Sequence, residues 1–274
     1  MGTVPFTYLG FPVYYGKKCN SHYENILRKI VQKLLGWQNK LLTYGGRHIL
    51  ITHVSQSIPL YLLSAINPTK GVINLLHHNF AKFFWSGNRG ERRKHWVAWE
   101  DICFPKKEGG VGFRTLHGVT KALFSKLWWR FRVSTDSLWS TYMWNKYCKK
   151  QHPVIAGARG ASHVWKKIME MREEVEQGIG WQIKSGNSSF WYDNWTRKGA
   201  LYLTNDMEDG DEDIEVQMCI NNGEWDKEKL CELVSEEVVV QIIKNIKLNV
   251  RQDEVDQPWW IPNTSGIFSV QVCF

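Results

Sequence analysis

Apolar residues recur at helical spacing through most of the first half of this 274-residue chain, and this pattern constrains its fold most. In the segment 22–40 the apolar stripe comprises Ile26, Ile30, Val31, Leu34 and Leu35. Such spacing puts the apolar side chains on one face of a helix. Ser21, with Glu24 three residues on, predicts a capping box at its start. Further helices are expected over 47–66, 72–85, 119–133 and 137–150.

Short strands and turns are expected between these helices. TYLGFPV (7–13) has the β-branched and aromatic composition of a strand. Gly45–Gly46 are expected to break the chain, and Pro59 is expected to kink or split the helix that contains it. The segment WVAWEDICF after residue 95 fits either a short strand or a turn of helix.

The character of the sequence changes at HPVIAGARGAS (152–162), which is rich in small residues, and we predict a domain boundary there. A helix ending at Gly178 should follow. WQIKSGNSSFWYDNW (181–195) predicts a hairpin with a Ser-Gly-Asn turn. One or two helices are expected over 227–246, and another hairpin-like pattern closes the sequence. The predicted fold is mainly α: a basic helical domain with short strands over 1–150, then a smaller α+β module rich in tryptophan over 151–274.

The two predicted domains carry opposite charge. Residues 1–150 contain 23 Lys and Arg against 6 Asp and Glu, a net charge of +17, whereas residues 151–274 contain 12 against 21, a net charge of −9. An excess of positive charge on this scale is typical of a polyanion binder. A basic surface that is simply solvated, without a partner, is the alternative.

The densest cluster of positive charge lies in KFFWSGNRGERRKHWVAW (82–99), between tryptophans. We predict that Trp85 ends a helix inside a core, that a basic loop over 86–95 faces solvent, and that Trp96 and Trp99 return to a packing layer. For the tryptophans, packing is favoured over base stacking, because large aromatic side chains gain most from burial.

Lysine and arginine side chains that neutralise phosphates are the expected binding residues, and RNA or an RNA–DNA hybrid is the expected partner. The candidate nucleic-acid-binding residues are Lys17, Lys18, Arg28, Lys33, Lys40, Arg47, Arg89, Arg92, Arg93, Lys94, Lys106 and Lys107.

No self-sufficient active site is evident in the sequence. A two-metal site needs converging carboxylates, yet there is no Asp-Asp pair, and Asp211 and Asp213 lie in a run of acids typical of a solvated loop. His77 and His78 are adjacent on a predicted helix, so they point to different faces. We therefore expect no catalytic residue, metal site or cofactor in this chain. The six scattered cysteines fit reduced, structural thiols.

The sequence shows neither a signal peptide nor an apolar run long enough to span a bilayer. An intracellular protein is expected, without a choice between nucleus and cytoplasm. Neither a membrane nor a small-molecule substrate is an expected partner.

The order of several landmarks resembles one family. TYLGFPV, GGRHILI, IPLYLL, FAKFFWSG, PKKEGGVGF and KALFSKLWWR follow one another, and WQIKSGNSSFWYDNW and WWIPNTSGIFSV come later. This order resembles the region after the polymerase palm of plant non-LTR (LINE-type) retrotransposon reverse transcriptases. The resemblance implies thumb-like and wrist-like helices that hold template–primer. Lys121 and Lys184 depart from the residues usual in that pattern.

The resemblance also implies what lies elsewhere. The polymerase carboxylates and their Mg²⁺ would precede Tyr8, and a zinc-binding region would follow Phe274. We therefore expect a fragment of an RNA-directed DNA polymerase that is not catalytic alone and whose partners include the rest of a reverse transcriptase. The alternative is a non-functional or repurposed remnant that acts as a protein-interaction module, with an apolar surface at Tyr8, Leu9, Phe11 and Tyr15.

Overall fold

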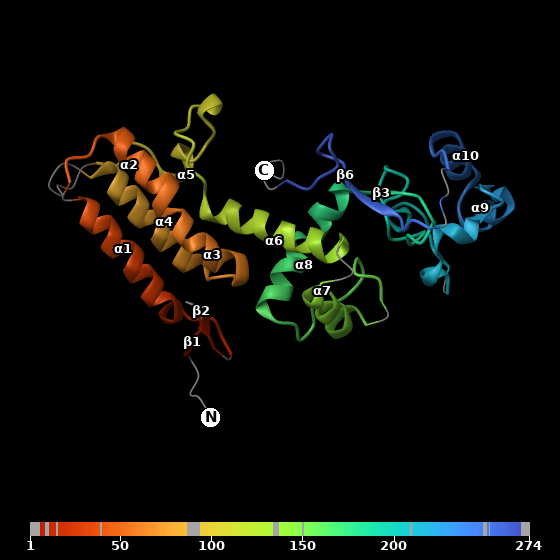
Figure 1. Ribbon diagram of the computed structural model, residues 1–274, viewed down its shortest axis with the longest axis horizontal. Helices are drawn as coiled ribbons and strands as arrows, with labels where there is room; N and C mark the ends of the chain where they lie inside the picture. Colours follow the sequence, from red (N-terminus) through yellow and green to blue (C-terminus); the bar gives the residue numbers. More distant parts are fainter. Residues whose placement is uncertain are drawn as a thin grey trace. The chain divides into compact units, whose positions relative to one another are not determined.

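The computed structural model describes residues 6–8, 11–14, 16–38, 40–86, 94–133, 137–149, 151–208, 210–248, 251 and 253–269. These residues are mainly helical and the strands are short, as predicted (Figure 1). The chain forms two compact units. The first unit comprises Met1–Phe124 with Ser162–Lys167, and the second comprises Ser125–Ala161 with Ile168–Phe274. The domain boundary predicted between residues 150 and 151 stays a prediction, and the two compact units divide the chain at other residues.

Helices build most of the first unit. Its elements are β1 (Phe6–Tyr8), β2 (Phe11–Val13), α1 (Glu24–Gln38), α2 (Tyr44–Leu50), α3 (Ser57–Ala65), α4 (Lys70–Trp85), α5 (Trp99–Ile102) and the first residues of α6 (Leu116–Val133). A turn of 3₁₀ helix, Asn20–Tyr23, precedes α1, and a π-helical segment, Ile51–Ser55, joins α2 to α3.

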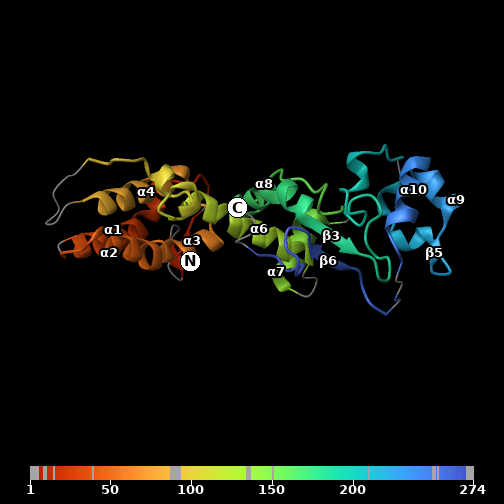
Figure 2. The ribbon, with the colours of Figure 1, turned by 90° about the horizontal axis from the view of Figure 1, so that it is seen from above.

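The helix α4 packs against α1 and α2 (Figures 1 and 2), and Leu62 and Leu63 of α3 belong to the same core. Thr69 begins α4, because its side chain accepts a hydrogen bond from the backbone N–H of Val72 at 3.3 Å. Most of the apolar residues of α4 are buried among those of α1, α3 and α5. The buried residues of α4 include Val72, Ile73, Leu76, Phe80, Phe83 and Phe84.

Several local predictions for the first unit were wrong. TYLGFPV forms two antiparallel strands, β1 and β2, rather than one. Ser21 lies inside the 3₁₀ turn, so the predicted capping box does not start α1. The buried face of α1 contains Leu27, whereas Leu35 is exposed.

Gly45 and Gly46 begin a helix rather than break one. They lie in the first turn of α2, where the side chain of Thr43 accepts a hydrogen bond from the backbone N–H of Gly46 at 3.2 Å. Pro59 lies in the first turn of α3, where its missing N–H costs no helical hydrogen bond. The interruption between α2 and α3 is therefore the π-helical segment that precedes the proline.

The second unit mixes helices with short strands. Its elements are the rest of α6, α7 (Leu138–Met143), most of α8 (His163–Gly178), β3 (Ile179–Gln182), β4 (Ile220–Asn221), β5 (Glu224–Trp225), α9 (Lys227–Leu233), α10 (Glu236–Asn245) and β6 (Gln257–Trp260). The core of this unit is rich in aromatic side chains: Phe190, Trp191, Tyr192 and Trp195 are all buried there.

The hairpin predicted over 181–195 does not form. Instead β3 pairs with β6 in an antiparallel sheet, with Ile179 opposite Trp260 and Gln182 opposite Gln257 (Figure 1). Glycine permits this pairing, because a Cβ at Gly178 would come within 2.5 Å of the Trp260 ring. The sheet thus joins segments about seventy-five residues apart, and no local sequence pattern predicts such a pairing.

Candidate functional site

Exposed lysines and arginines are spread over the first unit. Among the predicted binding residues, Lys17, Arg28, Lys33, Lys40, Lys94, Lys106 and Lys107 are exposed, and Lys18 is half-buried. The exposed acidic residues that the structure describes in this unit are Glu24, Glu100, Asp101 and Glu108. Positive charge therefore dominates the described surface of the first unit.

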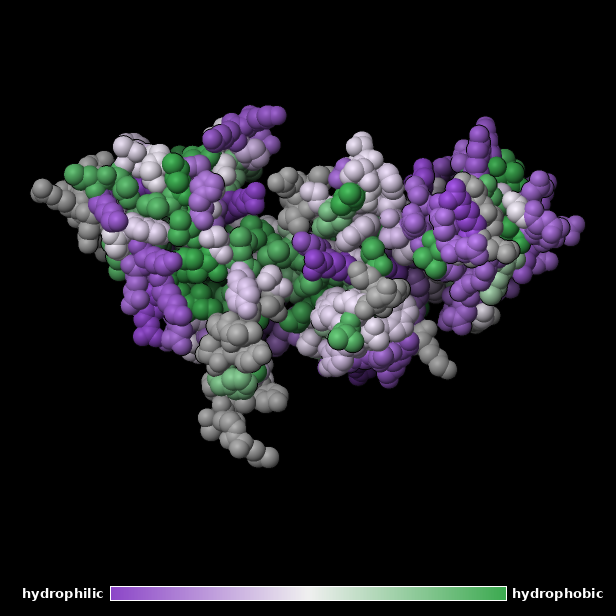
Figure 3. Space-filling model, in the orientation of Figure 1, coloured by the Kyte–Doolittle hydropathy of each residue, from purple (hydrophilic) through white to green (hydrophobic). Residues whose placement is uncertain are grey.

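The helix α1 presents the most regular part of this charge. Arg28, Lys29 and Lys33 lie on its exposed side, opposite the buried stripe, and hydrophilic side chains gather there in Figure 3. Lys29 and Lys33 are one helical turn apart, so their charges are neighbours. Within the described residues none of the three forms an ion pair with an acid. We call Arg28, Lys29 and Lys33 the α1 basic face.

Arg47 does not belong to an exposed basic surface. Its side chain is buried, with 3% of the residue exposed, and its guanidinium donates hydrogen bonds to the carbonyl oxygens of Phe84 and Ser86. These carbonyls lie at the C-terminal end of α4, where a helix dipole favours a cation. Arg47 therefore holds the fold together, and the expectation that it meets a phosphate is corrected.

The predicted basic loop is only partly described. Arg89, Arg92 and Arg93 lie outside the described residues, and Lys94 after them is exposed. Trp85 packs partly buried against the core, as predicted, and Trp99 stacks on Phe113 with ring centroids 5.0 Å apart. Trp96 was expected to return to the core, but 76% of it is exposed.

A tight turn presents Lys106 and Lys107. These residues form a short 3₁₀ turn with Glu108, closed by Gly109 at φ +87°. A Cβ at Gly110 would lie 1.9 Å from the carbonyl oxygen of Phe104, so only glycine fits there. The glycines of KKEGGVGF thus serve the backbone, and the lysines remain exposed.

The charge pattern alone did not single out every exposed cation. Lys29, Lys70, Lys82 and Arg114 are also exposed in the first unit. The signal that could have found Lys29 is its place on α1, on the side away from Leu27, Ile30 and Leu34.

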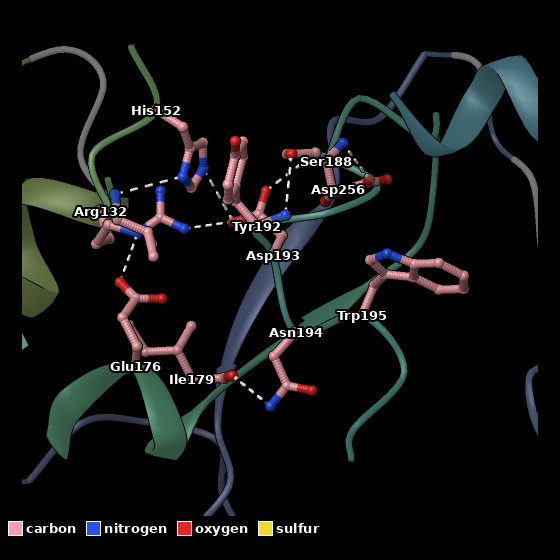
Figure 4. A network of polar contacts seen from close by, with 12 residues as sticks. Arg132, His152, Glu176, Ile179, Ser188, Tyr192, Asp193, Asn194, Trp195 and Asp256 are labelled. Atoms are coloured by element: carbon pink, nitrogen blue, oxygen red, sulfur yellow. Dashed lines mark hydrogen bonds and ion pairs between the residues drawn. The ribbon is translucent and has the colours of Figure 1, made fainter. Parts of the chain in front are cut away.

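The second unit contains a buried ionic network that the sequence pattern did not predict (Figure 4). Arg132, on α6, donates from Nε to Glu176 Oε1 of α8 at 2.7 Å and from its Nη2 to Asp193. Trp128 Nε1 donates to the same oxygen of Glu176 at 2.7 Å. The guanidinium also lies over the ring of Trp181, 5.4 Å from its centroid.

Asp193 is held from several sides. Its Oδ2 accepts a hydrogen bond from the backbone N–H of Ser189 at 2.8 Å, and His152 Nε2 lies 3.4 Å from its Oδ1. His152 Nδ1 accepts from the backbone N–H of Val154 at 3.4 Å, which places the ring proton on Nε2, facing the carboxylate. The His152 ring stacks on Tyr192 with centroids 5.1 Å apart.

Burial and charge act in opposite directions on these groups. Burial alone would raise the pKa of Asp193, but Arg132 and the hydrogen bonds from His152 and Ser189 lower it to about 2. Burial would lower the pKa of Arg132, but Glu176 and Asp193 raise it. Burial and Arg132 together lower the pKa of His152, against the opposing influence of Asp193. Arg132 and Asp193 are therefore a charged pair and His152 is neutral at pH 7.

The motif WQIKSGNSSFWYDNW has a structural explanation. Its turn wraps around the buried carboxylate of Asp256, which accepts hydrogen bonds from the backbone N–H groups of Lys184 at 2.6 Å, Gly186 at 2.9 Å and Ser188 at 2.8 Å. A Cβ at Gly186 would lie 2.8 Å from the backbone nitrogen of Gln217. Three converging N–H groups form an anion-binding nest, here filled by the chain itself.

No group of three or more His, Cys, Asp or Glu side chains is placed to hold a metal ion within the part of the chain that the structure describes. Among the described helices, none meets the length and apolar composition that a bilayer span requires.

Comparison with known proteins gives two relatives. The chain is 28% identical over 261 residues to a putative ribonuclease H protein of Arabidopsis thaliana, covering 92% of this chain and 42% of that protein. It is 29% identical over 143 residues to an uncharacterized mitochondrial protein of the same plant, covering 51% of this chain and 92% of that protein. No protein-family model matches. The chain thus spans about two fifths of the length of the first relative.

Proposed function

We propose that this chain is a segment of a LINE-type reverse transcriptase polyprotein and binds the backbone of template–primer nucleic acid through its first unit. The observation that carries the proposal is the α1 basic face, whose three cations are exposed without acidic partners among the described residues. The names of the two relatives are typical of retrotransposon-derived proteins, which supports the origin. The proposal assigns binding to this chain and no reaction.

The chemistry of the surface favours backbone contact over base reading. Lysine side chains on a helix face meet phosphates as point charges and carry no sequence information. Each neutralised phosphate releases counterions, so the slope of log affinity against log salt changes by about −0.9 per contact on a duplex. Binding through this face should therefore weaken steeply as salt rises and should tolerate changes of sequence.

Charge reversal on the α1 basic face tests the proposal. In the full chain, Lys29→Glu with Lys33→Glu should weaken binding of a blunt 20-base-pair RNA–DNA hybrid about 10-fold or more at 50 mM salt and flatten the salt slope by about 2. Fluorescence anisotropy at 50 to 200 mM salt measures both quantities. The two side chains are exposed, so the fold should be retained.

The matched control reverses the same number of charges on the second unit. Lys227→Glu with Lys247→Glu also changes two exposed lysines. An equal loss of affinity in both double variants would show that only net charge matters, which would overturn the assignment to α1. Hybrid binding with no dependence on salt would overturn it as well.

A second function is favoured by one observation. Phe6 and Val13 face each other across the hairpin of β1 and β2, and both are exposed. An exposed apolar pair suits a protein-interaction module. The predicted apolar residues Leu9 and Tyr15 lie outside the described residues, as do the side chains of Tyr8 and Phe11. Failure of the full chain to bind any hybrid at low salt would favour this second function.

A further inference from the structure

A second surface that suits nucleic acid lies on the second unit, on the helix that runs through α7 into a π-helical segment, Trp144–Cys148. Leu138, Tyr142 and Lys146 follow one another at intervals of four residues and so share one side of this helix. Leu138 is 90% exposed and Tyr142 is 56% exposed. We call these three residues, with Lys149, the Tyr142 surface.

The geometry holds a cation beside an open aromatic ring. Lys146 Nζ lies 3.0 Å from the hydroxyl of Tyr142 and 5.2 Å from the centre of its ring, so the ammonium lies at the hydroxyl end. The same Nζ is 5.3 Å from the centre of the Tyr147 ring. More than half of Tyr142 therefore remains accessible to a ligand while Lys146 contacts its hydroxyl.

The charge of this segment has one sign. Residues 137–149 contain Lys146 and Lys149 and no acidic residue. Neither lysine forms an ion pair within the described part of the chain. Lys149 has φ +55°, in the left-handed region, and follows a π-helical turn. π-Helical turns are rare in proteins, and those that occur are often found at functional sites.

An open aromatic ring beside lysines is the chemistry that binds a single strand. Unpaired bases stack on the ring, whatever their sequence, and the lysines meet the flanking phosphates. A duplex offers its bases no such contact, because they are already stacked on one another. We propose that the Tyr142 surface binds single-stranded nucleic acid, separately from the duplex contact of α1. This inference rests on the proposed function only in that the chain is a nucleic-acid binder.

The test compares two ligands and two kinds of variant in the full chain. The probes are a fluorescent 12-nucleotide oligouridylate and the blunt RNA–DNA hybrid. Tyr142→Ala should weaken binding of the oligouridylate about 10-fold, given what one base–aromatic stack contributes, and should leave binding of the hybrid unchanged. Tyr142→Phe keeps the ring and loses the hydroxyl, so it should stay within about 3-fold of the parent for both ligands.

The charge reversal at Lys29 and Lys33 should give the opposite pattern, with a large loss for the hybrid and a small loss for the oligouridylate. Binding of the hybrid with an unchanged oligouridylate affinity in Tyr142→Ala would overturn this inference and leave the proposed function intact. Binding of neither ligand would overturn the proposed function itself. An equal loss in Tyr142→Phe and Tyr142→Ala would exclude stacking. Because Tyr142 is largely exposed, the alanine variant should fold, which circular dichroism checks.

Discussion

Arg47 in the first unit and Arg132 in the second are both buried, but the acceptors of the hydrogen bonds described for them differ in kind. Arg47 donates to the carbonyl oxygens of Phe84 and Ser86, which are neutral acceptors at the end of α4. Arg132 donates to the carboxylates of Glu176 and Asp193. The charge of Arg132 is therefore compensated by buried acids, whereas the contacts of Arg47 fix the position of a helix end. The exposed cations of α1 differ from both, because among the described residues none of them pairs with an acid, which leaves their charge available to a partner.

The kind of acceptor matters because removal of the arginine leaves its acceptors buried without a donor. A buried carboxylate without its cation has lost the charge that offset its desolvation, and this is expensive. A buried carbonyl without its donor loses one hydrogen bond and keeps no uncompensated charge. Loss of the ion pairs of Arg132 should therefore cost more than loss of the hydrogen bonds from Arg47 to Phe84 and Ser86, although a count of positive charges treats the two arginines alike.

The largest effect is expected for Arg132→Met. The change keeps much of the side-chain volume but leaves the carboxylates of Asp193 and Glu176 without the cation that both of them contact. It should therefore lower the free energy of unfolding by about 3–5 kcal/mol. Hydrogen exchange of peptides over residues 179–195, recorded as urea is increased, measures the loss of stability in the second unit. Arg130→Met is the control, since Arg130 is exposed on the same helix. A cost equal to that of the control would mean that the network contributes nothing.

A smaller effect is expected for Arg47→Met. Loss of its charged hydrogen bonds to the two carbonyls should cost about 1.5–3 kcal/mol. Hydrogen exchange of peptides over residues 70–86 reports the end of α4. The matched control is Arg28→Met on α1, whose exposed side chain donates a hydrogen bond to the side chain of Asn25. A larger cost for Arg47→Met than for Arg132→Met would reverse the comparison and the physical argument behind it.

Helices were predictable from the sequence where their spacing is regular. The stripe in 22–40 and the apolar residues of 72–85 gave helices close to those observed, because burial of one face is a local signal. Strand pairing was not predictable in the same way. The turn at 184–188 closes on Asp256, some seventy residues later, so its pattern resembled a local hairpin although its partner is distant.

The candidate binding residues likewise differ in how far local sequence predicts their exposure. The exposure of Arg28 and Lys33 followed from their place opposite an apolar stripe. Arg47 and Arg132 could not be separated from them by residue type, because burial depends on where Ser86 and Asp193 arrive in three dimensions. Trp96 shows the converse case, since a tryptophan expected in the core is exposed. Charge and aromatic content are the basis for predicting a nucleic-acid partner, and the fold separates the candidate residues that are exposed from those that are buried.

The smallest expected effect concerns pH and sharpens the comparison between the units. Because burial and Arg132 lower the folded-state pKa of His152 below its usual 6.5, the unfolded chain binds more protons than the folded one as pH falls below about 7. Stability from this group is complete above pH 6.5 and is lost as pH falls toward the folded pKa, with a slope of at most about 1.4 kcal/mol per pH unit. His152→Gln, which keeps an acceptor and a donor but does not titrate, should flatten the pH dependence of the stability of the second unit between pH 7 and 5, as followed by hydrogen exchange over residues 179–195.

In the first unit His77 has its pKa lowered to about 4 by burial, aided by His117, so His77→Gln should flatten the pH dependence of stability there and leave that of the second unit unchanged. A slope that responds to both variants in both units would show that the two units do not unfold independently.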